Sequence, residues 1–186
     1  FLSCYVMAPI ALMNGGNTEQ KDKYLKGIVE NKYKFAVGFS EFISARNDFG
    51  FIFKNNKING KSIFVLDADD ASHLLLADEN GVIGVVETSD KNIEIIKLTT
   101  VDKTRSYSEV IFKNAPIDVL ENSITDIEPI KKSIDAGRII LAADSLGASA
   151  ALIRKAVEYS KERKQFGRAI GSFQAVKHMC AEMASD

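Results

Sequence analysis

Apolar and polar positions follow three different patterns along the chain and divide it into three zones. Residues 1–13 are almost continuously apolar, which predicts a buried helix. Asn17 and Gln20 then have the three-residue spacing of a capping box, so a second helix is expected to begin there. Its apolar face would carry Tyr24, Leu25 and Ile28.

Between about residues 33 and 117 the pattern changes to short apolar runs separated by turn residues. The runs cover residues 35–40, 51–53, 62–66, 73–77, 82–86, 93–98 and 109–112. The segment 78–81 (Asp-Glu-Asn-Gly) predicts a hairpin, and Asn59-Gly60 predicts a tight turn. Roughly seven evenly spaced strands favour an antiparallel barrel or sandwich.

The third zone is helical again. Pro129 suits the first turn of a helix, and the helical pattern continues without a break to Lys164. Phe166-Gly167 ends this run, and a further helix follows whose apolar stripe is Phe173, Val176, Cys180 and Met183. The fold class expected from the three zones is α+β: a central antiparallel β-barrel domain flanked by helical segments.

Composition excludes several classes of protein. The 186 residues are 46% hydrophobic, and 24 basic against 25 acidic residues give a net charge of −1. A disordered chain has fewer apolar residues, and a nucleic-acid binder normally has a basic excess. Residues 1–13 are too short to cross a bilayer, so no membrane span is expected. The chain opens at Phe1 and stops within a helical pattern, so we expect it to be part of a longer protein.

Two short motifs have a simpler explanation than a ligand site. Residues 59–62 (Asn-Gly-Lys-Ser) resemble part of a phosphate-binding loop, but Asn55 stands where that motif needs glycine, and a turn explains the string. His178 and Glu182 have the i, i+4 spacing of two metal ligands, yet no third ligand accompanies them. Two partly exposed helix residues are the favoured interpretation, and no metal site is predicted.

The segment 162–170 (Glu-Arg-Lys-Gln-Phe-Gly-Arg-Ala-Ile) is the most informative in the chain. It combines a helix end, a cluster of cations, a phenylalanine and a glycine stop. Arginines at such a corner can hold a pyrophosphate through bidentate contacts. The same cations also suit a solvated helix end, where they complement the helix dipole. Both interpretations are open on composition alone.

With Phe173-Gln174 after it, this segment resembles a signature of the acyl-CoA dehydrogenase family. The resemblance extends along nearly the whole chain. It covers the segments 19–25 (Glu-Gln-Lys-Asp-Lys-Tyr-Leu), 39–41 (Phe-Ser-Glu), 59–65, 110–116 and 137–147. The family subunit is about twice as long, so the resemblance implies a middle part. Residues 1–32 would be the last helices of the N-terminal helical domain, 33–120 the middle β-barrel domain, and 121–186 the first helices of the C-terminal helical domain.

The resemblance implies an FAD-dependent oxidation of the Cα–Cβ bond of an acyl-CoA. By position, Ser40 retains a hydroxyl for the flavin ring and Phe64 replaces the tryptophan that packs on it. The remaining cofactor residues match the part of the signature that reaches the FAD of a neighbouring subunit: Arg163, Gln165, Phe166 and Gln174. Asp135 and Arg138 match residues near the bound acyl-CoA. The implied partners are acyl-CoA, an electron-transfer flavoprotein or similar acceptor, and further copies of the subunit. The implied location is the cytoplasm, or the matrix of an organelle.

Three departures support an alternative. The Gly-Ser pair that follows Thr-Glu-Pro in the family is replaced by Ala45-Arg46, and Leu66 lacks the hydroxyl that would serve flavin N5. Gly137 stands where a subset of the family carries its catalytic glutamate, so no catalytic residue is expected in this chain and the chain alone is expected to be inactive. The alternative is a non-catalytic homologue with a degraded flavin site that binds CoA thioesters or serves assembly.

Overall fold

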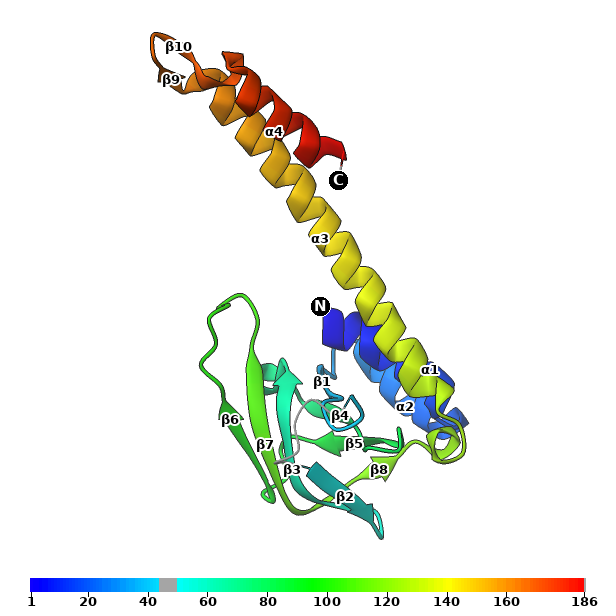
Figure 1. Ribbon diagram of the computed structural model, residues 1–186. Coiled ribbons are helices and arrows are strands. Elements are labelled where there is room, and N and C mark those ends of the chain that lie inside the picture. The colour runs from blue at the N-terminus through cyan, green and yellow to red at the C-terminus, as the bar shows by residue number, and fades with distance from the viewer. Residues whose placement is uncertain (44–49, 186) are drawn as a thin grey trace. The chain divides into compact units, whose positions relative to one another are not determined.

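A computed structural model describes residues 1–43 and 50–185 of the chain (Figure 1). The chain forms two compact units, Phe1–Arg138 and Ile139–Asp186. Helix α3 (Glu128–Glu162) begins in the first unit and ends in the second.

The first unit begins with helices, one of which has a capping box at its N-terminus. A π-helical turn (Leu2–Met7) continues into α1 (Ala8–Gly15), and α2 (Thr18–Val29) follows. The Asn17 side chain accepts a hydrogen bond from the Gln20 amide at 2.9 Å, and the Gln20 side chain accepts one from the Asn17 amide at 3.1 Å. The capping box expected from the sequence is therefore confirmed.

A mixed eight-stranded sheet forms the rest of this unit. Its strands are β1 (Phe35–Gly38), β2 (Gly50–Lys54), β3 (Lys57–Leu66), β4 (His73–Ala77), β5 (Ile83–Glu87), β6 (Ile93–Lys97), β7 (Tyr107–Pro116) and β8 (Asp118–Val119). The order is β6-β7-β3-β1-β4-β5-β8, and β2 lies outside this order and pairs with the first half of β3. Short 3₁₀ turns over Ala68–Asp70 and Glu121–Ile124 follow β3 and β8. The predicted α+β class with flanking helices is confirmed.

The prediction of an antiparallel barrel is wrong, because the strands pair differently. Strand β1 pairs parallel with β4, with Phe35 opposite His73, and no pairing between described residues joins the β6 edge to the β8 edge. The sheet is therefore open. A parallel pair is stable when both of its faces are buried, and here both are.

Two hydrophobic clusters cover the two faces of β1. Phe35 and Val37 belong to a cluster with the helical residues Leu12 and Tyr24, on the side of α1 and α2 (Figure 1). Ala36 belongs to the opposite cluster, to which strands β2, β3, β4, β5 and β7 also contribute residues. Burial on both sides explains why every residue of β1 and β4 is buried, so that apolar and polar positions do not alternate.

The tight turn predicted at Asn59-Gly60 is also wrong, because these residues lie inside β3. The β2–β3 hairpin turns at Asn55 and Asn56, which have φ angles of 52° and 55°. Both central residues of a type I′ turn need such left-handed angles, and asparagine tolerates them. Gly60 has a φ of 121°, and a Cβ there would lie 2.3 Å from the Gly50 carbonyl oxygen. Its glycine therefore serves the close approach of β2. The hairpin predicted at residues 78–81 does connect β4 and β5.

The second unit is a helical corner. It contains the rest of α3, a two-stranded hairpin of β9 (Lys164–Gln165) and β10 (Arg168–Ala169), a 3₁₀ turn (Ile170–Ser172) and α4 (Gln174–Ser185). In the described part of the chain, α3 is the one helix long and apolar enough to cross a membrane by length and composition. A long helix of a multi-helix domain meets the same criteria.

Candidate functional site

Two of the residues singled out by the sequence meet at one end of the sheet. Ser40 follows β1 and is buried, and its hydroxyl donates a 2.5 Å hydrogen bond to the carbonyl oxygen of Ile63. Phe64 is the next residue in β3, and 43% of its surface is exposed. The structure therefore brings Ser40 and Phe64 to the same place.

A β-bulge in strand β3 presents Phe64. Ser62 pairs with Val110 and Val65 pairs with Ser108, so two residues of β3 face one residue of β7. Phe64 has a φ of 58°, a left-handed angle that an aromatic residue rarely adopts. Such a conformation costs roughly 1–3 kcal/mol and persists only where the surroundings enforce it.

A buried carboxyl group, that of Glu41, contacts residues on both sides of this bulge: Ser62 in β3 and Ser40 after β1. Glu41 is 9% exposed, and its Oε2 lies 3.1 Å from the Ser40 hydroxyl and 3.2 Å from the Ser62 hydroxyl. Its other oxygen, Oε1, is buried without a hydrogen-bond partner among the described residues. Burial raises the pKa of Glu41 from 4.5 to about 7, although its contacts with its own backbone and with the Ser62 and Ser40 hydroxyls act in the opposite direction.

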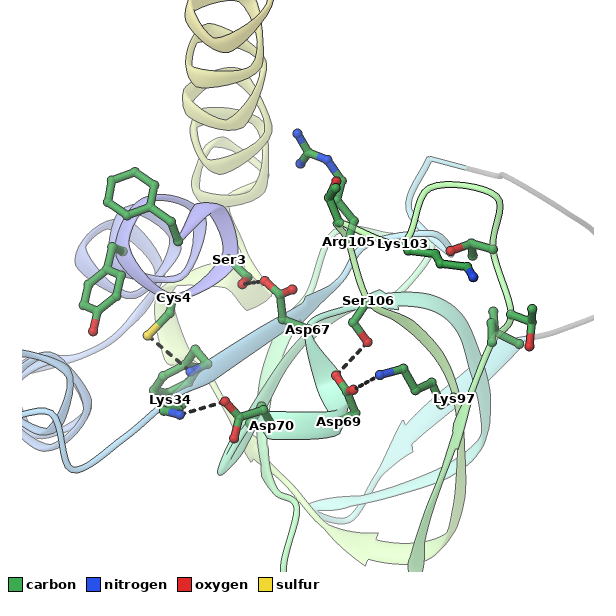
Figure 2. A pocket seen from close by; sticks show the side chains of 18 residues that line it. Ser3, Cys4, Lys34, Asp67, Asp69, Asp70, Lys97, Lys103, Arg105 and Ser106 are labelled. Carbon is green, nitrogen blue, oxygen red and sulfur yellow. Dashed lines mark hydrogen bonds and ion pairs between the residues drawn. The ribbon is translucent and has the colours of Figure 1, made fainter.

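A cavity of about 700 Å³, lined by both charged and apolar side chains, opens near the other end of β1 (Figure 2). The π-helical turn, the start of β1, the 3₁₀ turn after β3 and the loop between β6 and β7 line it. Three carboxylates hold these segments together. Asp67 accepts from Ser3 at 2.5 Å, Asp69 accepts from Lys97 at 2.6 Å, and Asp70 accepts from Lys34 at 2.7 Å.

The charges of this cavity neutralise one another in large part. The hydrogen bonds from Lys97 and Ser106 lower the pKa of Asp69, so it is ionised at neutral pH. Cys4 lies deeper, and its sulfur accepts a 3.4 Å hydrogen bond from the Phe35 amide. The lining suits a ligand that carries both polar groups and an apolar part. No sequence pattern indicates this cavity, because its residues come from segments about 100 positions apart.

Asp135 and Arg138 occupy the first turns of α3. Arg138 donates to Asp135 at 3.0 Å, and both side chains are largely exposed. Gly137 lies between them, and a Cβ there would be 3.1 Å from the sulfur of Met7. Any larger side chain at this position would have to displace Met7.

The other four predicted cofactor residues lie in the second unit. Gln165 and Phe166 belong to the β9–β10 hairpin, Arg163 immediately precedes it, and Gln174 begins α4. Phe166 is 92% exposed and has a φ of 52°. Its ring contacts that of Phe173, with 6.1 Å between the ring centroids.

Cations and a histidine surround this corner. The guanidinium of Arg168 lies 4.1 Å from the centroid of the Phe173 ring, a cation–π contact. His178 exchanges a 3.1 Å hydrogen bond with Gln174. No cluster of three metal-binding side chains occurs in the described residues, and His178 with Glu182 does not form one.

Comparison with known proteins identifies the fold. Residues 127–186 match the family model described as the C-terminal domain of acyl-CoA dehydrogenase. A short-chain specific acyl-CoA dehydrogenase of Clostridium acetobutylicum is 31% identical over 98% of this chain, which covers 53% of that protein. The chain belongs to the acyl-CoA dehydrogenase family.

One further relative and one solved structure resemble this chain over nearly its whole length. The CarC subunit of the caffeyl-CoA reductase–Etf complex of Acetobacterium woodii is 29% identical over 98% of this chain and is covered over 55% of its length. The solved structure of PigA with FAD and proline superposes with a TM-score of 0.85 at 24% identity, over 99% of this chain and 53% of PigA. Members of the acyl-CoA dehydrogenase family bind FAD. This chain spans about half the length of the relatives it matches.

The residues present fit FAD in kind. A flavin ring needs an aromatic or apolar face, and a pyrophosphate needs cations or helix N-termini. Phe64 is a half-exposed ring held in a costly backbone conformation, which is the arrangement expected of a residue kept for contact. In the second unit, Arg163 and Arg168 are exposed cations beside the start of α4. The Ser40 hydroxyl, by contrast, already donates to Ile63, so it is left only as an acceptor for a ligand.

Proposed function

We propose that this chain is the middle part of an FAD-dependent acyl-CoA dehydrogenase that oxidises the Cα–Cβ bond of an acyl-CoA. The family assignment supports the reaction class, and the juxtaposition of Ser40 with the exposed Phe64 is the observation that carries the cofactor. Bound FAD would accept the two electrons as a hydride from Cβ while the α-proton passes to a base, which leaves an enoyl-CoA.

Residues of the two units would contact different parts of the ligands. Phe64 would face the flavin ring, and Arg163, Gln165, Phe166 and Gln174 would contact the FAD of a second subunit. Exposure of Phe166, at 92%, supports a role in which another molecule covers it. Asp135 and Arg138 would contact acyl-CoA, since both are exposed and charged at the start of α3.

The domain organisation is also a proposal. Residues 1–32 would belong to an N-terminal helical domain, 33–120 to the middle β domain and 121–186 to a C-terminal helical domain. The match of residues 127–186 to the C-terminal domain model supports the last boundary. An electron-transfer flavoprotein is the proposed electron acceptor, because the relative CarC is a subunit of an Etf complex.

One observation favours the alternative, a homologue that keeps the fold without the redox reaction. Leu66 ends β3 where a hydroxyl would serve the flavin, and its side chain cannot donate a hydrogen bond.

Reconstitution with FAD distinguishes the two functions. Purified protein is mixed with FAD, and bound flavin is measured by its absorption after gel filtration. Butyryl-CoA is then added without oxygen. Bleaching of the bound flavin by butyryl-CoA in a longer protein that contains this chain supports the dehydrogenase. A protein that stays colourless yet binds butyryl-CoA supports the alternative.

A further inference from the structure

Four polar groups form a row of consecutive hydrogen-bond contacts next to the β-bulge of strand β3. The Ser62 hydroxyl lies 3.2 Å from Glu41 Oε2, which lies 3.1 Å from the Ser40 hydroxyl, which lies 2.5 Å from the Ile63 carbonyl oxygen. Ser62, Ser40 and Glu41 are all buried. The last group of the row belongs to the residue directly before Phe64.

The number of available protons decides which group donates in each of these hydrogen bonds. A serine hydroxyl has one proton to donate, and the short contact to Ile63 takes the proton of Ser40. The contact between Ser40 and Glu41 therefore needs its proton from Glu41. A neutral carboxyl supplies that proton and can still accept from Ser62. An ionised carboxylate would leave two acceptors facing each other at 3.1 Å.

We propose that Glu41 is the positioning residue of the Phe64 face. Its neutral carboxyl donates to Ser40 and so commits the Ser40 hydroxyl to Ile63, which fixes the bulge and turns the Phe64 ring outward. The identity of the ligand as a flavin rests on the proposed function; the positioning of Phe64 does not.

The surroundings of the carboxyl group agree with a neutral form. Oε1 is buried and has no hydrogen-bond partner among the described residues. Burying a neutral carbonyl oxygen without a partner costs far less free energy than burying a charged oxygen without one. No ion pair to Glu41 occurs within residues 1–43 and 50–185. Burial also raises its pKa to about 7.

Space around the chain of hydrogen bonds is tight. A Cβ at Gly38 would lie 3.2 Å from the Ser62 hydroxyl and 2.8 Å from Leu76. Glycine at the end of β1 therefore allows Ser62 to reach Glu41. The arrangement restrains the bulge through packing as well as through hydrogen bonds.

The chain has no tryptophan, so the substitution Phe64→Trp creates a single fluorescent reporter on the bulge itself. In this background, Glu41→Gln keeps a neutral donor, whereas Glu41→Leu keeps the buried volume without one. We expect the Leu variant to shift the emission to longer wavelength and to raise the iodide quenching constant about twofold, because a released side chain gains solvent access. The Gln variant should match its parent.

A purely structural role predicts a different result. Unchanged emission and quenching in the Leu variant, or equal changes in the Gln and Leu variants, would overturn the proposal. If circular dichroism shows that the Leu variant does not fold, the same comparison is made between Ser40→Ala and Ser40→Thr. Loss of the Ser40 hydroxyl should then release the reporter, and threonine should retain it.

FAD binding to the chain with its native Phe64 separates this inference from the proposed function. We expect Glu41→Leu to weaken FAD binding about fivefold and Glu41→Gln to leave it unchanged, measured by quenching of flavin fluorescence. Absence of FAD binding by the unsubstituted chain counts against the proposed function, and the tryptophan reporter then decides the positioning role alone. Equal FAD affinity in the Leu variant and the unsubstituted chain would refute the link between Glu41 and the flavin face.

Discussion

The hydroxyl of Tyr24 donates a 2.7 Å hydrogen bond to the carboxylate of Asp118, which ties helix α2 to strand β8 across 94 positions of sequence. Tyr24 is 1% exposed, and Gln20 donates to the other oxygen of Asp118 at 2.6 Å. The same carboxylate and burial raise the pKa of Tyr24 far above its ordinary value, so the phenol stays protonated and donates.

Removing that hydroxyl should destabilise the fold measurably. We expect Tyr24→Phe to lower the free energy of unfolding by about 1–2 kcal/mol, because the half-buried carboxylate of Asp118 loses one of its two donors and keeps only Gln20. Urea unfolding followed by circular dichroism measures the change. Tyr5→Phe is the matched control: its hydroxyl donates to Asn31 at the surface, so its loss should cost less than about 0.5 kcal/mol. Equal effects of the two variants would contradict this account.

Glu41 should make stability depend on pH in the direction opposite to an ordinary paired carboxylate. Its pKa is about 7 in the folded chain against an ordinary 4.5, so folding holds the proton more tightly. The contribution is complete below pH 4.5 and is lost as pH rises through 7, on the order of 2–3 kcal/mol. Unfolding free energies of the unsubstituted chain and Glu41→Gln, compared between pH 4.5 and 8, isolate it. A difference between the two proteins that does not vary with pH would exclude the predicted linkage.

His73 should make the fold less stable at acidic pH. It is 4% exposed, stacks on Phe35 with 5.1 Å between ring centroids, and its Nε2 has no partner among the described residues. Burial lowers its pKa, with Glu87 acting against this and Lys23 adding to it. Folding therefore favours the neutral ring, so stability should fall as pH drops below 6.5.

The substitution His73→Phe tests this prediction, since it keeps an aromatic ring against Phe35 and Tyr33 and removes the titrating group. We expect thermal unfolding of the variant between pH 5 and 6.5 to depend less steeply on pH than that of the unsubstituted chain. Parallel pH profiles would show that another group is responsible.

Phe166 should matter for binding and not for folding. With 92% of its surface exposed, its replacement by alanine should change the free energy of unfolding by less than about 0.5 kcal/mol. If a second subunit and FAD cover this ring, the same variant should lose FAD binding and self-association. Analytical ultracentrifugation with and without FAD measures both. Phe173→Ala is the control for local structure, since Phe173 contacts both Phe166 and Arg168 and its loss should cost stability as well.

Local signals in the sequence predicted local structure well. Asn17 and Gln20 are three residues apart and cap the same helix, so their spacing contains all the information that the capping box needs. The pairing of β1 with β4 depends instead on residues 38 positions apart, Phe35 and His73, and a continuous apolar run indicates burial on both faces without naming the partner strand. The predicted barrel failed for that reason.

The candidate site was predictable in part. A resemblance along the chain pointed to Ser40 and Phe64, and the structure brings them together. The role of Glu41 was not visible, because it depends on a bulge that displaces Ile63 toward Ser40 and on the donor count of two serines. Neither the bulge nor the direction of a hydrogen bond leaves a periodic signal in the sequence. The four signature residues of the second unit remain predictions.

The position of β1 in the sheet has a consequence for biosynthesis. Both of its neighbours come much later in the chain: Val37 pairs with Leu66, and Phe35 pairs with His73. During translation, the apolar segment Phe35–Gly38 therefore leaves the ribosome before either partner strand has emerged. Until then its main-chain amides and carbonyls are open to pairing with any other nascent strand, so this short stretch is a point at which a growing polypeptide of this kind is exposed to aggregation.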